Sequence, residues 1–376
     1  MFKCVDLFCG AGGLSEGFRQ NGFEILLAND FDNWCEATYK LNHPDTEFIS
    51  GPIEDITPSQ ILKALDLKQG ELDCIIGGPP CQAFSVYNHQ RGMHDERSGL
   101  FREYLRLVKG ILPKYVVIEN VPGMNSVENG VAVTEIKQGL TALGYSIEVA
   151  LLKAEEFGVP QERRRLIFIG NRVGANIPLP QPTHGEGLLP FVTVWDAISD
   201  LPKLQNGEGY EVANYPIIPQ SEYQRMMRDG AQMVFNHVAP TLGAVNIQRL
   251  RHIPEGGSWR DIPVDLLPPG MKRARRSDHT KRYGRLRKDG LASTILTKCD
   301  PHWGAFFHPE QDRAITVREA ARLQCFPDKV RFEGSRVEQY KQVGNAVPII
   351  LSAAVAKVVY QALLENSFKA VKLHVL

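Results

Sequence analysis

The chain has 376 residues, 43% of them hydrophobic and 23% charged, which is the composition of a globular protein rather than of a disordered chain or a fibre. Its formal net charge is zero, so the chain as a whole is not a polycation that would attract nucleic acid through its total charge. Seven cysteines without regular spacing and without a CxxC pair argue against a disulfide framework and a structural zinc site. They indicate a reducing, cytoplasmic environment.

Seven short apolar runs alternate with amphipathic stretches in the first 170 residues. The runs are KCVDLF, FEILLAN, TEFIS, LDCIIG, YVVIEN, SIEVALL and RLIFIG, with helical patterns such as LSEGFRQNG and FREYLRLVKGIL between several of them. This alternation predicts an α/β fold with a doubly wound, mostly parallel, Rossmann-like sheet. The linker before RLIFIG, KAEEFGVPQERR, has no strong helical pattern, so we expect a hairpin and an antiparallel last strand.

A glycine-rich loop follows the first predicted strand. Gly10, Gly12 and Gly13 stand directly before a helix, where glycines let the backbone approach a ligand closely. Asp30 ends the second strand at an offset that suits a ribose diol, and the Phe31 ring could stack on adenine. Together these features favour an adenosine-bearing cofactor, although a strand–helix turn without a ligand would share the glycine pattern.

A cysteine, a carboxylate and two arginines are expected at the same edge of the sheet as this loop. Cys81 follows GGPP after the fourth strand, Glu119 ends the fifth strand, and Arg163 and Arg165 flank the start of RLIFIG. Ligands of open α/β sheets bind at the carboxyl ends of the strands, so these groups should share one crevice. The two prolines restrict the direction of the thiol, as a nucleophile requires. The polar stretch 82–99 is typical of a lid over a substrate, or of an ordinary surface loop.

The sequence changes character after Gly170. Many prolines between 176 and 220 predict a second, irregular domain. Helix signals return at TVREAARLQ, where Thr316 is a candidate N-cap with Glu319 three residues later. The apolar segment 346–364 contains Pro348 and a lysine, and we interpret it as a buried terminal helix rather than a membrane span.

The second domain contains a dense basic run at 272–288. Nine lysines and arginines stand there against one aspartate, a local net charge of +8 in an otherwise acidic chain. Arginine outnumbers lysine and Tyr283 lies inside the run, which favours a phosphate-binding surface for nucleic acid over a merely solvated face.

Six motifs, taken together and in order, resemble those of the cytosine-C5 DNA methyltransferases of the bacterial restriction-modification type. The motifs are DLFCGAGGL, GGPPCQAFS, ENVPG, QERRRLIFIG, ITVREAARLQCFPD and QVGNAVP. The resemblance implies S-adenosylmethionine as cofactor and double-stranded DNA as substrate, with the target cytosine flipped out of the duplex. It also implies a cytoplasmic monomer without a membrane partner, which protects host DNA beside an independently acting restriction endonuclease.

The same resemblance implies a methyltransferase domain made of residues 1–178 and 338–376, and a smaller, irregular target-recognition domain with a hinge at 179–337. A cleft between the two would receive the DNA.

The resemblance also assigns roles to individual residues. Cys81 would add to C6 of cytosine, with Arg163 favouring its thiolate; protonated Glu119 would bind N3, and Arg165 would hold O2. The cofactor-binding residues would be Phe8, Gly10, Gly12, Gly13, Leu14, Asp30, Phe31, Ile53, Gly78, Pro80, Leu100, Asn345 and Val347. The DNA-binding residues would be Ser85, Arg97, Gln161, Arg273, Arg275, Arg276, Lys281, Arg282 and Arg285. Pro52 stands where the family usually has an aspartate for the adenine amino group.

Three other functions share parts of this pattern. A tRNA-modifying branch of the same family carries the same catalytic motifs, but the long insert 180–290 favours an enzyme that reads a DNA sequence. A nucleotide-dependent oxidoreductase would explain the glycine loop and Asp30, but not Cys81 and Glu119. A DNA-binding module without activity is disfavoured because every catalytic position is filled.

Overall fold

The computed structural model describes residues 1–80, 99–125, 130–174, 177, 179–275, 277 and 280–373, with side chains up to residue 367. The chain forms two compact units. The first unit contains Met1–Lys153, Arg164–Pro182 and Ile349–Leu376, and the second contains Ala154–Arg163 and Thr183–Pro348. These limits differ from the expected ones chiefly at 154–163 and 338–348, which both belong to the second unit. The role of each unit stays a prediction.

A seven-stranded sheet forms the centre of the first unit. Its strands are β1 (Phe2–Leu7), β2 (Phe23–Asp30), β3 (Glu47–Ser50), β4 (Cys74–Gly77), β5 (Tyr115–Asn120), β6 (Ser146–Lys153) and β7 (Arg164–Asn171), in the order β3-β2-β1-β4-β5-β7-β6. Strands β1 to β5 run parallel, and β7 is antiparallel to both β5 and β6. The seven predicted strands and the antiparallel direction of RLIFIG are therefore confirmed.

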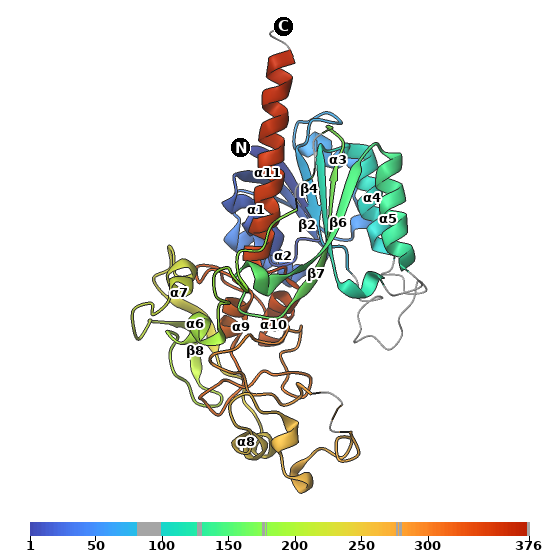
Figure 1. Cartoon of the computed structure of the whole chain (residues 1–376). Coiled ribbons are helices and arrows are strands. Elements are labelled where there is room, and N and C mark those ends of the chain that lie inside the picture. Colours follow the sequence, from blue (N-terminus) through green and yellow to red (C-terminus); the bar gives the residue numbers. More distant parts are fainter. Residues whose placement is uncertain are drawn as a thin grey trace. The chain divides into compact units, whose positions relative to one another are not determined.

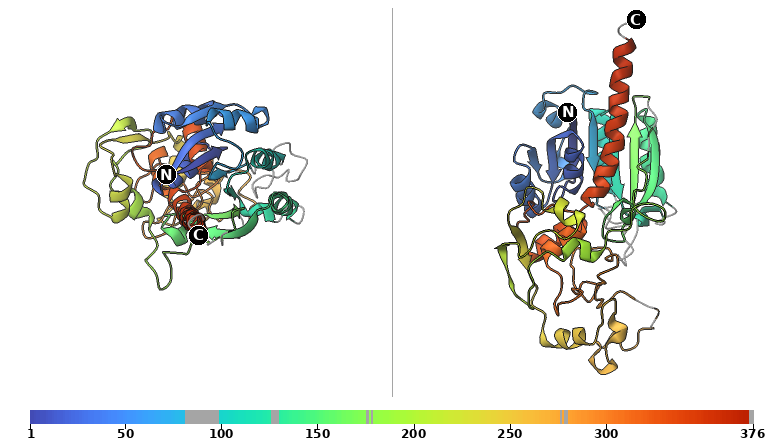
Figure 2. Two further views of the ribbon diagram at one scale, coloured as in Figure 1. Left: turned by 90° about the horizontal axis from the view of Figure 1, so that it is seen from above. Right: turned by 60° about the vertical axis from the view of Figure 1, so that its left-hand side comes forward.

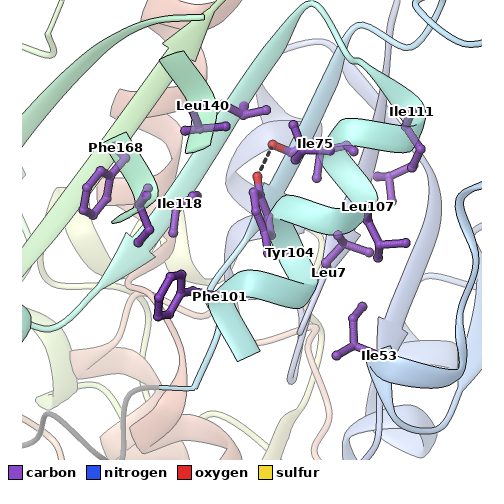
Figure 3. Packing of buried hydrophobic residues seen from close by; sticks show 14 of the residues in the cluster. Leu7, Ile53, Ile75, Phe101, Tyr104, Leu107, Ile111, Ile118, Leu140 and Phe168 are labelled. Atoms are coloured by element: carbon purple, nitrogen blue, oxygen red, sulfur yellow. Dashed lines mark hydrogen bonds between the residues drawn. The ribbon is translucent and has the colours of Figure 1, made fainter. Parts of the chain in front are cut away.

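Helices cover both faces of this sheet, with α4 and α5 on one face and α1 and α11 on the other (Figure 1, Figure 2). The helices of the first unit are α1 (Gly13–Gln20), α2 (Asn33–Asn42), α3 (Pro58–Ala64), α4 (Leu100–Ile111), α5 (Val131–Ala142) and α11 (Ile349–Leu373). Buried side chains of α4, among them Leu107 and Ile111, pack against strand residues such as Ile75 (Figure 3). Each fully buried Leu or Ile side chain contributes about 1.5–3 kcal/mol. The Tyr104 hydroxyl donates a hydrogen bond to the Ile75 carbonyl at 3.0 Å, so α4 is fixed on β4, whose end leads to the site.

Helix α11 packs on α1, the helix that follows the glycine loop. The Ser352 hydroxyl donates to the Leu14 carbonyl at 2.9 Å, and a Cβ on Gly17 would lie 2.4 Å from Ser352 Oγ. Within the described residues, one helical stretch, Arg336–Ser367, is long and apolar enough to cross a membrane, and 56% of its most apolar window is buried. Core helices of soluble proteins pass the same test, and Val355 and Val359 of α11 are buried.

The second unit has short elements joined by irregular chain. They are α6 (Val194–Ile198), β8 (Gly209–Ala213), α7 (Glu222–Met227), β9 (Val234–Val238), α8 (Ala244–Arg251), α9 (Val317–Leu323) and α10 (Arg336–Asn345), with β8 and β9 forming a two-stranded sheet. The predicted capping box of α9 is confirmed, because the Thr316 side chain accepts from the Glu319 amide while the Glu319 carboxylate accepts from the Thr316 amide. Buried arginines connect the irregular segments: Arg322 contacts Asp200 and Asp328 inside this unit.

Candidate active site

The candidate active site lies at one edge of the central sheet. Strands β1, β2, β4 and β5 are parallel, so their carboxyl ends meet at this edge, and antiparallel β7 begins there. The strand order reverses between β1 and β4. Open α/β sheets bind ligands at such a reversal.

The glycine loop leaves β1 in a conformation that most side chains disfavour. Phe8, Gly10 and Gly12 have φ angles of 61°, 54° and 84°. A Cβ on Gly12 would lie 2.7 Å from the His43 ring, so this position requires glycine. Around Gly10, by contrast, no atom of the described residues would lie within 4 Å of an added Cβ, which leaves room for a ligand beside this part of the loop.

Asp30 connects the end of β2 to this loop. Its Oδ2 accepts a hydrogen bond from the Gly10 amide at 2.8 Å, and its Oδ1 accepts from the Asp32 amide at 2.9 Å. Burial raises the pKa of Asp30, and the nearby Asp32 charge acts in the same direction. A carboxylate has several acceptor positions, so the Asp30 side chain could also accept a hydrogen bond from a ribose hydroxyl. The adjacent Phe31 ring is 64% exposed and is available for stacking.

The end of β3 supplies an apolar wall instead of a carboxylate. The Asn29 side chain donates to the carbonyls of Ile49 and Gly51 at 2.9 and 3.0 Å, which fixes the chain before Pro52. Ile53 is buried, whereas Glu54 and Asp55 point to solvent.

Asp6, in β1, was missed by the sequence analysis. Its Oδ2 accepts from the Ser15 hydroxyl at 2.6 Å, and Oδ1 is buried without a hydrogen-bond partner among the described residues. Burial, and secondarily the charge of Asp30, raises the pKa of Asp6 to about 7. A buried carboxylate beside Asp30 and the space at Gly10 fit an adenosine cofactor that carries positive charge. The sequence signal that could have revealed Asp6 is its position as a charged residue inside the apolar run KCVDLF.

The ends of β4 and β5 place a carboxylate beside the chain that leads to the cysteine. Arg165 Nε lies 2.5 Å from Glu119 Oε1, and both side chains are nearly buried. A Cβ on Gly78 would lie 3.2 Å from Glu119 Oε2. The Asn120 side chain donates to the Pro79 carbonyl at 3.5 Å. The structure therefore brings Glu119, Arg165 and Gly78 together.

The other predicted residues stand at the starts of helices, in the loop before Cys81, in the second unit or outside the described chain. Gly13 and Leu14 begin α1, Leu100 begins α4, and Pro80 is half-buried at the end of the described part of its loop. Asn345 and Val347 belong to the second unit, so their predicted cofactor contacts stay predictions. Cys81, Ser85, Arg97 and Arg276, with the predicted lid, lie outside the described residues.

Arg163 is a buried brace of the second unit. Its Nη1 donates to the Ile295 carbonyl at 3.1 Å, and its Nη2 donates to the carbonyls of Gly344 and Ala346 at 3.0 and 2.9 Å. These three hydrogen bonds are enough to explain why the Arg163 side chain is buried. Its predicted effect on the Cys81 thiolate remains a prediction.

Two residues that were predicted to bind DNA are likewise used inside the second unit. Gln161 is fully buried, and its Nε2 donates to the Leu323 carbonyl at 2.7 Å. Arg285 is buried and donates to the Ile253 carbonyl at 2.9 Å and to Asp312 at 2.7 Å. Both side chains are thus engaged inside the second unit, and their role in DNA binding stays a prediction.

Nearly the whole sequence matches a known protein family. The family described as C-5 cytosine-specific DNA methylase matches residues 2–361. The chain belongs to this family. Its activity is that of a DNA cytosine-5 methyltransferase.

Individual relatives agree with this assignment. The chain is 35% identical to the type II methyltransferase M.AgeI of Thalassovita gelatinovora, over 96% of this chain and 100% of that protein. It is 34% identical to the type II methyltransferase M.DdeI of Desulfomicrobium norvegicum, over 94% of this chain and 87% of that protein.

Solved structures share the methyltransferase fold. A prophage-encoded E. coli protein, described as a DNA modification methyltransferase, superposes with a TM-score of 0.78 at 24% identity and covers 97% of this chain and 100% of its own. DNMT2 of Spodoptera frugiperda gives a TM-score of 0.62 at 16% identity, over 96% of this chain and 100% of that one.

Proposed function

We propose that this enzyme transfers a methyl group to C5 of a cytosine in duplex DNA through a transient bond between Cys81 and C6 of a flipped-out base. The observation that carries the proposal is the Glu119–Arg165 pair beside Gly78, three residues before Cys81. The pair offers a carboxyl group and a guanidinium to one planar substrate. A target cytosine presents N3, N4 and O2 on the edge that these groups recognise.

The chain's own groups divide the chemistry between them. The Cys81 thiolate adds to C6, which makes C5 nucleophilic, while Glu119 shares a proton with N3 and Arg165 donates to O2. After C5 has been methylated, a base removes the C5 proton, the C5–C6 double bond re-forms, and the thiolate leaves. The base must leave the stack for any of this to occur.

The cofactor that the family uses, S-adenosylmethionine, supplies the electrophilic methyl group when it is bound. Asp30 would accept hydrogen bonds from the ribose hydroxyls, and Phe31 and Ile53 would contact the adenine ring. The methionine part of the cofactor would lie beside the loop at Gly10. Without an aspartate at Pro52, recognition of the adenine amino group would fall to backbone groups of this turn.

Basic residues of the second unit would supply the DNA contacts. We keep Arg273, Arg275, Arg276, Lys281 and Arg282 in this set. The relatives M.AgeI and M.DdeI are named as type II methyltransferases, which supports a role in protecting host DNA within a restriction-modification system.

The covalent step can be tested with a duplex that carries 5-fluorocytosine, which lacks the C5 proton and therefore traps the adduct. Wild-type enzyme, incubated with this duplex and S-adenosylmethionine, should give a complex that resists denaturation, with the DNA attached to Cys81 in the mass spectrum. The Cys81→Ala variant should bind DNA without an adduct and without methyl transfer. Cys35→Ala, which changes a buried thiol of α2, should form the adduct normally.

Two outcomes would contradict the proposal. Normal turnover by the Cys81→Ala variant would show that the reaction needs no covalent bond to Cys81. Methylation of tRNA but not of duplex DNA would show that the substrate is RNA. An assay that offers tRNA and duplex DNA in parallel, with labelled cofactor, distinguishes these two substrates.

A further inference from the structure

Part of the basic run at 272–288 is paired with acidic side chains inside the second unit. Four of its residues have acidic partners: Lys281 with Glu162 at 2.5 Å, Arg285 with Asp312 at 2.7 Å, Arg287 with Asp289 at 2.9 Å and Lys288 with Glu310 at 3.2 Å. Lys272, Arg273 and Arg275 are exposed. The net charge of the run therefore overstates what it offers to a phosphate.

Arg282 differs from its neighbours because an aromatic ring, and not an acid, holds it. Its guanidinium carbon lies 4.8 Å from the centre of the Trp303 ring. The described part of the chain gives this guanidinium no hydrogen-bond or ion-pair partner. Because its N–H groups have no partner among the described residues, they remain available to an anion while the Trp303 ring contacts the cation.

The backbone around this pair is fixed on both sides. The Trp259 amide donates to the Arg282 carbonyl at 3.0 Å, and the Tyr283 amide donates to the Pro301 carbonyl at 2.7 Å. A Cβ on Gly284 would lie 2.5 Å from Ala305, so glycine is needed where the two segments approach. Arg282 and Trp303 therefore meet because their chain segments are hydrogen-bonded side by side.

The Trp303 ring is held in place but stays partly open to solvent. It is 46% exposed, and the His302 ring lies 5.0 Å away at 85°. His302 Nδ1 is within 3.0 Å of the Tyr283 hydroxyl, which anchors this histidine on the buried side. An exposed tryptophan that is braced in this way presents a rigid surface rather than a mobile one.

Two groups close to the pair, His302 and Arg249, are less suited than Arg282 to binding an anion. Burial lowers the pKa of His302, and Arg282 and Arg249 act in the same direction against Asp300, which disfavours a positive charge on this ring. The Arg249 side chain already donates to the Leu266 carbonyl at 2.7 Å and to Asn246 at 2.8 Å.

We propose that Arg282 binds a backbone phosphate of duplex DNA, and that Trp303 is the positioning residue that holds the guanidinium ready for it. This inference rests on the proposed function. A free arginine loses much of its rotamer freedom when it binds, whereas stacking restrains the side chain beforehand. A planar guanidinium also matches two phosphate oxygens at once. The contact is independent of DNA sequence and fixes the position of the second unit on the duplex.

The test measures the affinity of the full-length enzyme for a fluorescent duplex over a range of salt concentrations, with S-adenosylhomocysteine present. The slope of log K against log salt is negative, and each lost phosphate contact reduces its magnitude by about 0.9. Arg282→Gln and Trp303→Ala should each reduce the magnitude of the slope by about this amount. Each should also weaken binding roughly tenfold at low salt, and a tenfold change corresponds to about 1.4 kcal/mol. Trp303→Phe, which keeps an aromatic face, should restore both values.

The matched control is Arg287→Gln, because Arg287 lies in the same run but is paired with Asp289, and it should bind like wild type. The double variant Arg282→Gln/Trp303→Ala should bind no worse than Arg282→Gln alone, since the two residues form one contact. If Trp303→Ala melts at a lower temperature, Arg282→Gln and Trp303→Phe still decide the question.

The inference is overturned if wild type binds and methylates DNA while Arg282→Gln keeps the wild-type slope, or if Trp303→Phe binds as poorly as Trp303→Ala. A wild-type enzyme that neither binds nor methylates duplex DNA would instead overturn the proposed function.

Discussion

At the scale of single residues, the Glu119 carboxylate forms a nearly buried ion pair with Arg165. Arg165 lies 2.5 Å from it, and both side chains are close to nine-tenths buried. Removing one member of such a pair leaves an uncompensated charge and costs about 3–5 kcal/mol. We expect Arg165→Ala to lower the free energy of unfolding by an amount near this range and to abolish turnover. Urea unfolding with a single-turnover assay measures both.

The adjacent arginine provides the control. Arg164 is exposed, so Arg164→Ala should change stability by less than about 0.5 kcal/mol. Equal losses from the two substitutions would show that the ion pair is not the cause.

Asp30 predicts a pH dependence of cofactor binding. Its pKa is raised, so it takes up a proton at a higher pH than an ordinary carboxyl group. Protonation weakens the hydrogen bonds that Asp30 accepts from the Gly10 amide and, in the proposed complex, from the ribose hydroxyls of the cofactor. Affinity for S-adenosylhomocysteine should therefore be full at high pH and fall as the solution is acidified. Titration calorimetry at a series of pH values from 8 downwards measures it.

The Asp30→Asn variant separates this effect from the titration of Asp6, whose pKa is about 7. The variant should bind more weakly at pH 8 and respond less to acid. An unchanged pH profile would assign the dependence to another group.

At the scale of elements, the contact between α1 and α11 supports the glycine loop from behind. A Cβ on Gly17 would lie 2.4 Å from Ser352 Oγ and 2.6 Å from the Ala353 backbone. Gly17→Ala should therefore push the two helices apart and lower stability by about 1–3 kcal/mol. Cofactor affinity should fall with it, because α1 carries the loop. Gln20→Ala, on the exposed side of the same helix, should leave the melting temperature within a degree or two of wild type in calorimetry.

The elements were predictable because their signals are local. Each strand of the sheet is a short apolar run, and the missing helix before β7 revealed its antiparallel direction. The uses of Gln161, Arg163 and Arg285 were not predictable, because a motif shows that a side chain is polar but not where its partner is. Arg163 donates to carbonyls 132, 181 and 183 residues away. Gly78 and Glu119 come together because β4 and β5 are neighbours, and the topology predicted that.

At the scale of the whole molecule, the second unit should be the acid-sensitive part. Burial, reinforced by nearby arginines, lowers the pKa of His308 to about 4, and its Nδ1 accepts from two backbone amides, which leaves no room for a proton. The unfolded state therefore binds the proton more readily, and stability is full above pH 6.5 and is lost as the pH falls towards 4. The loss is on the order of 3 kcal/mol. Arg313 lowers the pKa of buried Glu319 against the effect of burial, which adds a loss of the same sign at lower pH.

Thermal unfolding at pH 8, 6 and 5 tests this expectation. The His308→Gln variant should be less stable at pH 8 but lose less on acidification, whereas His252→Gln, at an exposed histidine, should follow wild type. An acid response that is the same in all three proteins would place the sensitive groups elsewhere.

The order of synthesis gives the α1–α11 contact a further consequence. Leu14 and its partner Ser352 are 338 residues apart, so a nascent chain carries α1 long before its packing partner has been translated. An unfinished chain on the ribosome thus lacks the support for its glycine loop, and we expect it to be inactive. A cell that acquires this gene would gain its first modified cytosines only after complete molecules are released.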